Sequence, residues 1–305
     1  MMHGADFRPV RIEETAPAKI NLALHVTGQR NDGYHLIDSL VTFCQHGDRL
    51  TFTLSDQDEF QITGRFGAML SADADGRDGN LVVRARDLLR KALAAENSAA
   101  PPVSIVLEKE LPIASGIGGG SADAAGTLRG LLRLWRADIS DETLQRLALA
   151  LGADVPMCLQ SRPLRASGIG EILTPLPQMP ALALVLGNPL KGVSTPTIFR
   201  LLANKANPVM PDLPTDAALS DWIERLGTLR NDLEPPARAL LAEIGMLSDM
   251  FAAEGALFTR MSGSGATCFG IFADQHHAEQ AAATLRQKRP DWYFQASQTY
   301  PGDMA

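Results

Sequence analysis

Short apolar runs alternate with polar turns over the first sixty residues of the chain. Their β-branched, aromatic and leucine positions are typical of strands, and the polar stretches GQRNDGYH (28–35) and SADADGRDGN (71–80) predict loops. Gly64 ends the β pattern before a helical pattern begins. The predicted strands are INLALHV (20–26), LIDSLVTFC (36–44), DRLTFTL (48–54), EFQIT (59–63) and, farther along, an alternating segment within PPVSIVLEKELP (101–112).

Helical spacing of apolar residues begins after the second polar loop. The segment 140–152 opens with Ser-Asp-Glu and ends in glycine, so it carries the residues that helix ends prefer. The first half of the chain is therefore predicted to be a β-rich region followed by helices. The predicted helices are LVVRARDLLRKALAAE (81–96), SADAAGTLRGLLRLWRA (121–137) and SDETLQRLALALG (140–152).

Prolines concentrate between residues 160 and 180, which indicates a change of region. Beyond them ALALVLG (181–187) predicts a buried strand, and helices are expected from Pro196, from about Ala217 and from Pro235. The last quarter has the order strand, strand, helix, strand, which suits an α+β sandwich with antiparallel strands. Its segments are LFTRMS (257–262), ATCFGIF (266–272), HAEQAAATLRQKR (277–289) and DWYFQASQ (291–298).

The composition is that of an ordinary globular protein with room for about two domains, on a prior of roughly 150 residues each. The 305 residues are 45% hydrophobic and 21% charged, with a formal net charge of −7. An acidic chain of this kind is not expected to bind nucleic acid or anionic membranes, because phosphate backbones require clustered Lys and Arg. The three cysteines are too sparse for a disulfide framework and fit a reducing compartment.

Neither a signal peptide nor a membrane span is predicted. The first residues contain no apolar core of the kind that signal peptides have, and no run approaches the roughly 18 apolar residues that a span requires. We therefore expect a cytoplasmic protein.

One stretch, PIASGIGGGSADAAG (112–126), contains five glycines, four of them directly before a predicted helix. The unpaired N–H groups at a helix start attract anions, and glycines allow the backbone to approach a phosphate closely. Ser121 adds a hydroxyl at the expected N-cap position. The stretch therefore predicts a phosphate site, although a plain glycine-rich turn between strand and helix would have the same composition.

Three well-known phosphate-binding loops do not fit this stretch. No Gly-Lys pair occurs anywhere in the chain, so there is no Walker A loop. A Rossmann G-x-G-x-x-G starting at Gly116 would need glycine at Ser121. The HRD and DFG motifs of protein kinases are absent as well. HExxH and cysteine–histidine clusters are also absent, so zinc is not expected.

The spacing of Pro112 and Gly116-Ile117-Gly118 resembles the ATP loop of the GHMP kinase superfamily. That superfamily usually continues with two serines, whereas this chain has Gly119 and Gly120 before Ser121. The GIGGGSADAA form is similar to the branch of 4-diphosphocytidyl-2-C-methyl-D-erythritol kinases. The resemblance implies that the loop holds ATP. The implied ATP-binding residues are Lys109, Pro112, Ser115, Gly116, Ile117, Gly118, Gly119, Gly120 and Ser121.

Four further segments resemble the same branch, in the same order along nearly the whole chain. Ile37 and Met157 are the two departures, and each replaces one apolar residue by another. The segments are PAKINLALHVTGQRNDGYHLIDSL (17–40), GADVPMCL (152–159), LRNDLEPPA (229–237) and MSGSGATCFGIF (261–272).

The resemblance implies that Asp154 and Lys19 carry the chemistry. A kinase that acts on an alcohol must align the hydroxyl with the γ-phosphate, manage its proton and offset the developing charge. Asp154 matches the proposed base of the family, and Lys19 would pair with it and keep it ionised. Without the resemblance, the residues alone favour Asp154 as a capping residue in a turn and Lys19 as a solvated charge at a strand end. Whether Asp154 abstracts the proton or orients the hydroxyl stays open.

Substrate recognition is assigned by the same resemblance to the amino-terminal signature and to two later segments. Tyr34 offers a flat face on which a cytosine ring can stack, and His35 offers hydrogen bonds to its edge. Phe199 is a candidate for the other side of the ring or, equally, a core residue. The implied substrate-binding residues are Asn21, Tyr34, His35, Phe199, Ser264 and Gly265; for the last two, a β-bulge or tight turn is the alternative.

ATP requires magnesium on general grounds, to neutralise its phosphates. No motif identifies the protein ligands of the ion, because the superfamily's serines are missing at 119 and 120. Ser121 is the nearest replacement, and phosphates and water would supply the other ligands. Lys109 is expected either to help hold ATP or, beside Glu108 and Glu110, to be an ordinary exposed residue at a strand end.

The sequence thus predicts a two-domain α+β kinase with ATP and substrate between the domains. The resemblance implies an N-terminal domain like ribosomal protein S5 (1–165) and a ferredoxin-like C-terminal α/β sandwich (166–305). The expected reaction phosphorylates the 2-hydroxyl of 4-diphosphocytidyl-2-C-methyl-D-erythritol, in a monomer or homodimer. The alternatives are a homoserine- or mevalonate-type kinase and a non-catalytic nucleotide-binding regulator on the same fold.

Overall fold

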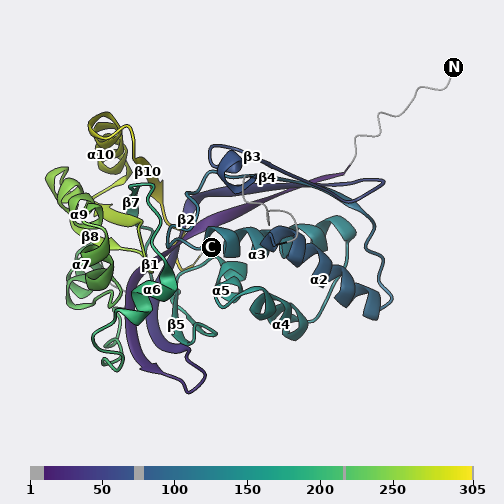
Figure 1. The fold of residues 1–305 in the computed structure, drawn as a ribbon, viewed down its shortest axis with the longest axis horizontal. Helices are drawn as coiled ribbons and strands as arrows, with labels where there is room; N and C mark the ends of the chain where they lie inside the picture. Colours follow the sequence, from purple (N-terminus) through teal and green to yellow (C-terminus); the bar gives the residue numbers. More distant parts are fainter. Residues whose placement is uncertain (1–9, 72–78, 216–217, 304–305) are drawn as a thin grey trace.

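The computed structural model describes residues 10–71, 79–215 and 218–303. Residues 72–78 of the predicted polar loop and Ala217, near the predicted start of a helix, lie outside these ranges. Figure 1 shows two lobes joined by a long hairpin. In one lobe helices pack against a large sheet, and in the other helices lie on the outer side of a smaller sheet. This arrangement confirms the predicted α+β organisation.

The first lobe is built on a six-stranded sheet. Its longest strands, β1 (Arg11–Gln29) and β2 (His35–Leu54), pair antiparallel along their whole length. The remaining strands are β3 (Glu59–Thr63), β4 (Val103–Glu108), β5 (Leu164–Gly168) and β6 (Ile172–Pro175), in the order β3-β4-β2-β5-β6. The helices of this lobe are α1 (Gly67–Ser71), α2 (Leu81–Ala95), α3 (Gly119–Trp135), α4 (Asp141–Leu151) and α5 (Val155–Gln160).

The two strands predicted at 36–44 and 48–54 are one continuous strand, β2. The sequence His46-Gly47-Asp48 has the composition of a turn, yet pairing with β1 continues through it, with a register shift between Pro17 and Lys19. Gly47 is required there because a Cβ would lie 2.2 Å from the backbone oxygen of Ala16. The bulge keeps both strands paired while the hairpin bends from one lobe into the other.

The second lobe has a four-stranded sheet in the order β10-β7-β9-β8, and its strands are antiparallel, as predicted. Its strands are β7 (Ala183–Asn188), β8 (Phe258–Met261), β9 (Cys268–Phe272) and β10 (Tyr293–Gln298). Its helices are α6 (Thr195–Arg200), α7 (Leu219–Thr228), α8 (Glu234–Leu240), α9 (Glu243–Ala253) and α10 (Gln275–Lys288). Among the described residues, no helix combines the length and the apolar character that a membrane span requires.

Strands β5 and β6 were not predicted. They belong to the first sheet, because β5 pairs with β2 and β6 pairs with β5. The expected domain boundary between residues 165 and 166 falls inside β5. The chain reaches the second sheet only with β7. We therefore propose that the boundary follows Pro175.

Three buried clusters hold the lobes together. The first lies between the six-stranded sheet and α2 to α5, and the second lies under α8, α9 and α10. The third joins the lobes, because it packs Leu22 and Leu40 of the long hairpin against Leu184 and Phe269 of the second sheet. Burying large apolar side chains of this kind contributes about 2 kcal/mol each, so the relative position of the two lobes is fixed by packing.

Candidate active site

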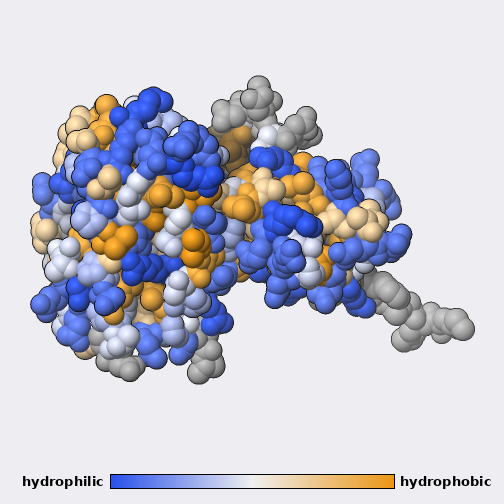
Figure 2. Space-filling model, turned by 90° about the horizontal axis from the view of Figure 1, so that it is seen from below, coloured by the Kyte–Doolittle hydropathy of each residue, from blue (hydrophilic) through white to orange (hydrophobic). Residues whose placement is uncertain are grey.

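A cleft of about 1250 Å³ lies between the two lobes. It is lined by the start of α3, the bulged part of β1, the 32–35 turn and α6. The space-filling view in Figure 2 shows the indentation between the lobes, with hydrophobic residues beside it. Of the sequence-predicted residues, the cleft brings together Lys19, Asn21, Tyr34, His35, Lys109, Pro112, Ser115, Gly116, Gly118, Gly119, Gly120, Ser121, Asp154, Phe199 and Ser264.

Two predicted residues do not line the cleft. Ile117 is fully buried, and only its backbone takes part in the site, because its carbonyl accepts a hydrogen bond from Lys19 N at 2.9 Å. Gly265 packs behind Ser264, where an added Cβ would lie 2.7 Å from the sulfur of Met261. Both therefore shape the backbone of the site from behind.

The glycine stretch turns tightly before α3. Gly116 and Gly118 have φ values of +76° and +66°, and a Cβ at Gly116 would lie 2.6 Å from the carbonyl oxygen of Ser262. Only glycine adopts this conformation without strain at so close an approach. Ser262 also donates a hydrogen bond to Gly116 O at 3.1 Å, so the second glycine motif supports the first.

The helix begins earlier than predicted. Gly118 is the N-cap of α3 and offers no side-chain hydrogen bond, and Ser121 is the third residue of the helix rather than its N-cap. Without a side-chain cap, the first N–H groups of α3 depend on other acceptors, and the cleft gives a phosphate access to them. Ser121 itself lines the cleft.

Lys19 and Asp154 form the polar centre of the cleft. Lys19 Nζ donates to Asp154 Oδ2 at 2.8 Å. The lysine side chain is 7% exposed and the carboxylate 39% exposed. Asp154 immediately precedes α5, and Gly118 lies against the Lys19 side chain, where an added Cβ would come within 3.1 Å of Lys19 Cβ. The pair is thus held rigidly on the lysine side and open to the cleft on the carboxylate side.

Lys109 lies in a second ionic cluster beneath the start of α3. Its ammonium donates to Asp48 Oδ2 at 2.5 Å and to Asp123 Oδ2 at 2.6 Å, and all three side chains are almost completely buried. Asp48 accepts two more hydrogen bonds, from the backbone N–H groups of Glu110 and Leu111. Lys109 is therefore not the exposed residue at a strand end that its acidic neighbours allowed.

Burial and the nearby Asp48 raise the pKa of Asp123 to about 8, and the Lys109 ammonium partly offsets this rise. Lys109 has a raised pKa because the attraction of the two carboxylates outweighs burial. Asp123 Oδ1 is buried and has no hydrogen-bond partner among the described residues. The cluster carries one carboxylate more than its lysine can neutralise, so the proton belongs on Asp123, the carboxyl group with fewer donors.

The opposite end of the cleft is aromatic. The rings of His35 and Phe199 stack with centroids 4.6 Å apart, and Tyr34 is 59% exposed beside them. His35 Nε2 is buried without a hydrogen-bond partner in the described part of the chain, and burial together with Lys205 lowers the pKa of the imidazole. This end offers a flat apolar surface and a neutral imidazole with an unused nitrogen.

Asn21 and Ser264 lie between the two ends. Asn21 Nδ2 donates to Ser39 Oγ at 2.8 Å, and its Oδ1 is buried without a partner in the part of the chain that the structure describes. The Ser264 hydroxyl lies 2.7 Å from that of Thr195, at the start of α6. These groups place acceptors and donors along the wall of the cleft.

Several residues of the site were missed. Asp48 and Asp123 complete the Lys109 cluster, Asn80 lines the cleft where it caps α2, and Arg200 and Lys205 line the aromatic end. Asp123 is part of the glycine-rich stretch 112–126, so that motif could have identified it as a residue of the site. Asp48, 61 residues before Lys109, gives no local signal, because only the pairing of β2 with β4 brings the two together.

Comparison with known proteins places this site among kinases. Residues 80–162 match the GHMP kinases N terminal domain, and residues 215–291 match the GHMP kinases C terminal family. The 4-diphosphocytidyl-2-C-methyl-D-erythritol kinase of Rhizobium johnstonii is 62% identical over 291 residues, which cover 95% of this chain and 94% of that protein.

Solved structures give the same result. A crystal structure of 4-(cytidine 5'-diphospho)-2C-methyl-D-erythritol kinase has 34% sequence identity and a TM-score of 0.78, over 95% of this chain and all of that one. The homoserine kinase of Cytophaga hutchinsonii has a TM-score of 0.69 at 18% identity, over 99% of each chain, and shares the fold.

Proposed function

Because the chain belongs to the 4-diphosphocytidyl-2-C-methyl-D-erythritol kinase family of the GHMP kinases, we propose that it phosphorylates that cytidine nucleotide with ATP. The acceptor is the 2-hydroxyl, and the products are the 2-phosphate and ADP, in the non-mevalonate route to isoprenoid precursors. One observation carries the proposal. A single cleft joins a glycine-rich helix start, an ion pair open to the cleft, and an aromatic surface at the far end.

The start of α3 holds the ATP phosphates in this proposal. Its free N–H groups and the partial positive charge of the helix end act on the phosphate oxygens. Lys109 stabilises the backbone that leads into the glycine loop. It donates to Asp48, and Asp48 accepts hydrogen bonds from the N–H groups of Glu110 and Leu111. Its contribution to ATP binding is therefore to position the loop.

Ser121 lines the cleft in the first turn of α3, so its hydroxyl would be the protein ligand of a magnesium ion bound to the nucleotide. Magnesium bound to the nucleotide neutralises phosphate charge. The chain's own residues then position the acceptor, and Tyr34, His35 and Phe199 hold its pyrimidine ring. The stacked His35–Phe199 pair gives the ring a surface of matching shape.

Asp154 handles the proton of the acceptor hydroxyl. The hydroxyl oxygen attacks the γ-phosphorus, the bond between that phosphorus and the β,γ-bridging oxygen breaks, and ADP leaves with the electron pair. The hydroxyl proton passes to the Asp154 carboxylate and from there to water. Lys19 donates to Asp154 Oδ2 and keeps the other oxygen available to the substrate.

The test is an ADP-release assay with the purified full chain, magnesium, ATP and the cytidine nucleotide, with homoserine and mevalonate as alternative acceptors. We expect turnover only with the cytidine nucleotide, and a new phosphomonoester signal by ³¹P NMR. Turnover of homoserine or mevalonate instead would overturn the substrate assignment. Nucleotide binding without ADP release would show a non-catalytic protein.

A cytoplasmic location is part of the proposal. Cys44, Cys158 and Cys268 are all buried and unpaired, and burial raises the pKa of each thiol. Free, unreactive thiols suit a reducing compartment.

A further inference from the structure

Four cationic side chains line the cleft among the described residues, and they differ in how their charge is balanced. Lys19 pairs with Asp154, and Lys109 pairs with two carboxylates. Arg200 donates to the hydroxyl of Thr197 at 2.9 Å, and Lys205 donates to the amide oxygen of Gln29 at 3.3 Å. Within the described ranges, neither of these two forms an ion pair with a carboxylate.

Both unbalanced cations lie at the aromatic end of the cleft. Arg200 directly follows Phe199 at the end of α6. The Lys205 charge acts on the imidazole of His35. In a chain of net charge −7, two unpaired cations at one end of a binding cleft form a local positive field.

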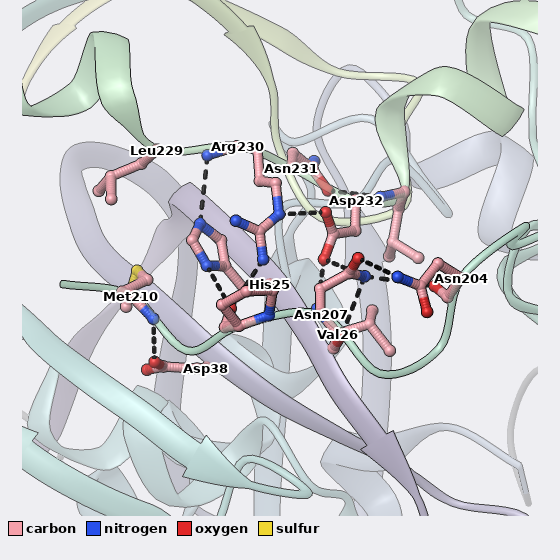
Figure 3. Close-up of polar contacts among 12 residues, drawn as sticks. His25, Val26, Asp38, Asn204, Asn207, Met210, Leu229, Arg230, Asn231 and Asp232 are labelled. Carbon is pink, nitrogen blue, oxygen red and sulfur yellow. Dashed lines mark hydrogen bonds and ion pairs between the residues drawn. The ribbon is translucent and has the colours of Figure 1, made fainter.

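Lys205 is held there by a tethered segment, residues 203–210, which we call the strap. Figure 3 shows the strap lying across the end of β1 and the 229–232 turn. Asn207 donates to Val26 O and to Asp232 Oδ2, and the carbonyl of Pro208 accepts from the Arg230 guanidinium at 2.7 Å. The position of Lys205 within the strap is therefore fixed before any ligand binds.

Two more tethers hold the later part of the strap. His25 accepts a hydrogen bond at Nε2 from the Arg230 N–H, so its Nδ1 carries the proton and donates to Pro208 O at 3.2 Å. Met210 is buried, and its N–H donates to Asp38 Oδ2 at 2.7 Å (Figure 3). A loop without regular structure is ordinarily mobile, and these side-chain and backbone hydrogen bonds, the Met210–Asp38 bond among them buried, restrict that motion.

We propose that Arg200 and Lys205 bind the diphosphate of the cytidine nucleotide and so determine that the enzyme requires a nucleoside diphosphate. This inference rests on the proposed function, because the diphosphate belongs to the proposed substrate. With the pyrimidine on the Tyr34–His35–Phe199 surface and the acceptor hydroxyl at Asp154, the diphosphate lies between them. A guanidinium and an ammonium without carboxylate partners are suited to phosphate oxygens, and both carry donors to spare.

The test compares the affinities of two probes, cytidine and cytidine 5′-diphosphate, measured by calorimetry on the full chain. The variants are Arg200→Met and Lys205→Met, which keep the side-chain length and remove the charge. Each is expected to weaken binding of the diphosphate about tenfold and to leave binding of cytidine unchanged. The double variant is expected to lose roughly a hundredfold and to show a weaker dependence on salt.

Lys191→Met is the matched control, because Lys191 lies outside the cleft and pairs with Glu243. It makes the same charge change and is expected to leave both affinities unaltered. Lys205→Arg is expected to restore most of the lost affinity. Far-ultraviolet circular dichroism checks that each variant is folded.

The other outcomes each overturn the inference. Equal losses for cytidine and its diphosphate would place the two cations on the base or ribose. A loss confined to ATP would place them on the other substrate, and unchanged affinities would remove them from the site. If the unaltered chain neither binds cytidine diphosphate nor turns over the substrate, the proposed function itself fails. That result differs from one in which the unaltered chain binds the diphosphate and the variants bind it equally well.

Discussion

Two lysines lie beside the same glycine-rich helix start, and their surroundings are opposite. Lys19 pairs with one carboxylate, Asp154, whose side chain is 39% exposed to the cleft. Lys109 lies between Asp48 and Asp123, and all three side chains are 4% exposed or less. The open pair has a carboxylate oxygen free to meet a substrate, whereas the closed cluster has its ammonium fully engaged. The same kind of ion pair is thus suited to catalysis at Lys19, where it is open to the cleft, and to stabilising the fold at Lys109, where it is closed.

The charge balance differs as well. One lysine and one carboxylate neutralise each other in the open pair. The closed cluster has one carboxyl group more than its lysine can neutralise, and burial, together with the nearby Asp48, raises the pKa of Asp123. We expect changes in the open pair to reduce catalysis, and changes in the closed cluster to reduce stability.

Asp154→Asn gives the largest expected effect on the open pair. The amide keeps the shape of the side chain and cannot accept the hydroxyl proton. Loss of a general base lowers rates by about 10²–10⁴, so we expect kcat to fall about a thousandfold, or about 4 kcal/mol in activation free energy. Steady-state kinetics with magnesium and ATP measure it.

The thermal midpoint and the ATP affinity of this variant are the controls, and both are expected to stay close to those of the unaltered chain. The Asp154 carboxylate is partly solvated, and the amide oxygen that replaces it still accepts a hydrogen bond from Lys19, so the substitution removes little stability. If Asp154→Asn keeps full activity, Asp154 is not the base.

Lys109→Met tests the closed cluster. It leaves the buried Asp48 carboxylate and the Asp123 carboxyl group without their cation, and breaking a buried ion pair in this way costs about 3 to 4 kcal/mol of unfolding free energy. Urea denaturation measures the loss. Lys19→Met is the matched comparison, because it removes an equally buried lysine whose partner carboxylate reaches water.

For Lys19→Met we expect about 1 kcal/mol or less of lost stability, together with a marked loss of kcat. Equal destabilisation by the two lysine variants would contradict the division between an open and a closed cluster.

The fold was predictable where the sequence pattern is local and repeated. The strand at 20–26 lies inside a longer observed strand. The strand at 101–112 and the helices at 81–96 and 140–152 end within four residues of the observed ends. The strands β5 and β6 were missed because prolines mark that stretch as a linker, whereas Pro175 ends an edge strand, where proline is tolerated.

The site was predictable to the extent that its residues stand in contiguous motifs. Lys19, Asp154 and the glycines come from such motifs, and the structure places them along one cleft. The partners of Lys109 and the position of Lys205 depend on tertiary contacts between distant segments. No spacing in the sequence indicates that Asp48 lies beneath the glycines or that the strap lies across β1.

Asp123→Asn tests the closed cluster through the pH dependence of the free energy of unfolding. Burial and Asp48 raise the pKa of Asp123 to about 8, against an ordinary value of 3.8 in the unfolded chain. Between these pH values the folded protein holds a proton that the unfolded chain has released. The free energy of unfolding therefore falls as the pH rises through this window, and the stability from this group is lost above the folded pKa.

In Asp123→Asn this contribution is absent, so its stability is expected to fall less than that of the unaltered chain between pH 6 and about pH 8.5. Thermal unfolding at several pH values, without nucleotide or magnesium, measures the difference. Histidines titrate equally in both proteins and cancel. Parallel stability profiles would show that Asp123 is ionised in the folded protein.

The smallest expected effects concern the glycines above the two lysines. Gly118 has a φ of +66°, and an added Cβ would lie 3.1 Å from Lys19 Cβ, so Gly118→Ala meets both backbone strain and the side chain of the open pair. The left-handed conformation costs a residue with a Cβ about 1–2 kcal/mol. Gly120→Ala is the matched control, because a Cβ there would only make an ordinary contact with Leu81, at 3.6 Å.

Alanine favours a helix over glycine by up to about 1 kcal/mol, so Gly120→Ala is expected to be neutral or slightly stabilising. Gly118→Ala is expected to lower the unfolding free energy by about 1–2 kcal/mol and to lower kcat as well, since it displaces Lys19. Thermal unfolding and steady-state kinetics measure both. If the two variants behave alike, the strained turn at Gly118 has no part in placing Lys19, and the geometry of the open pair must then come from β1 and α5 alone.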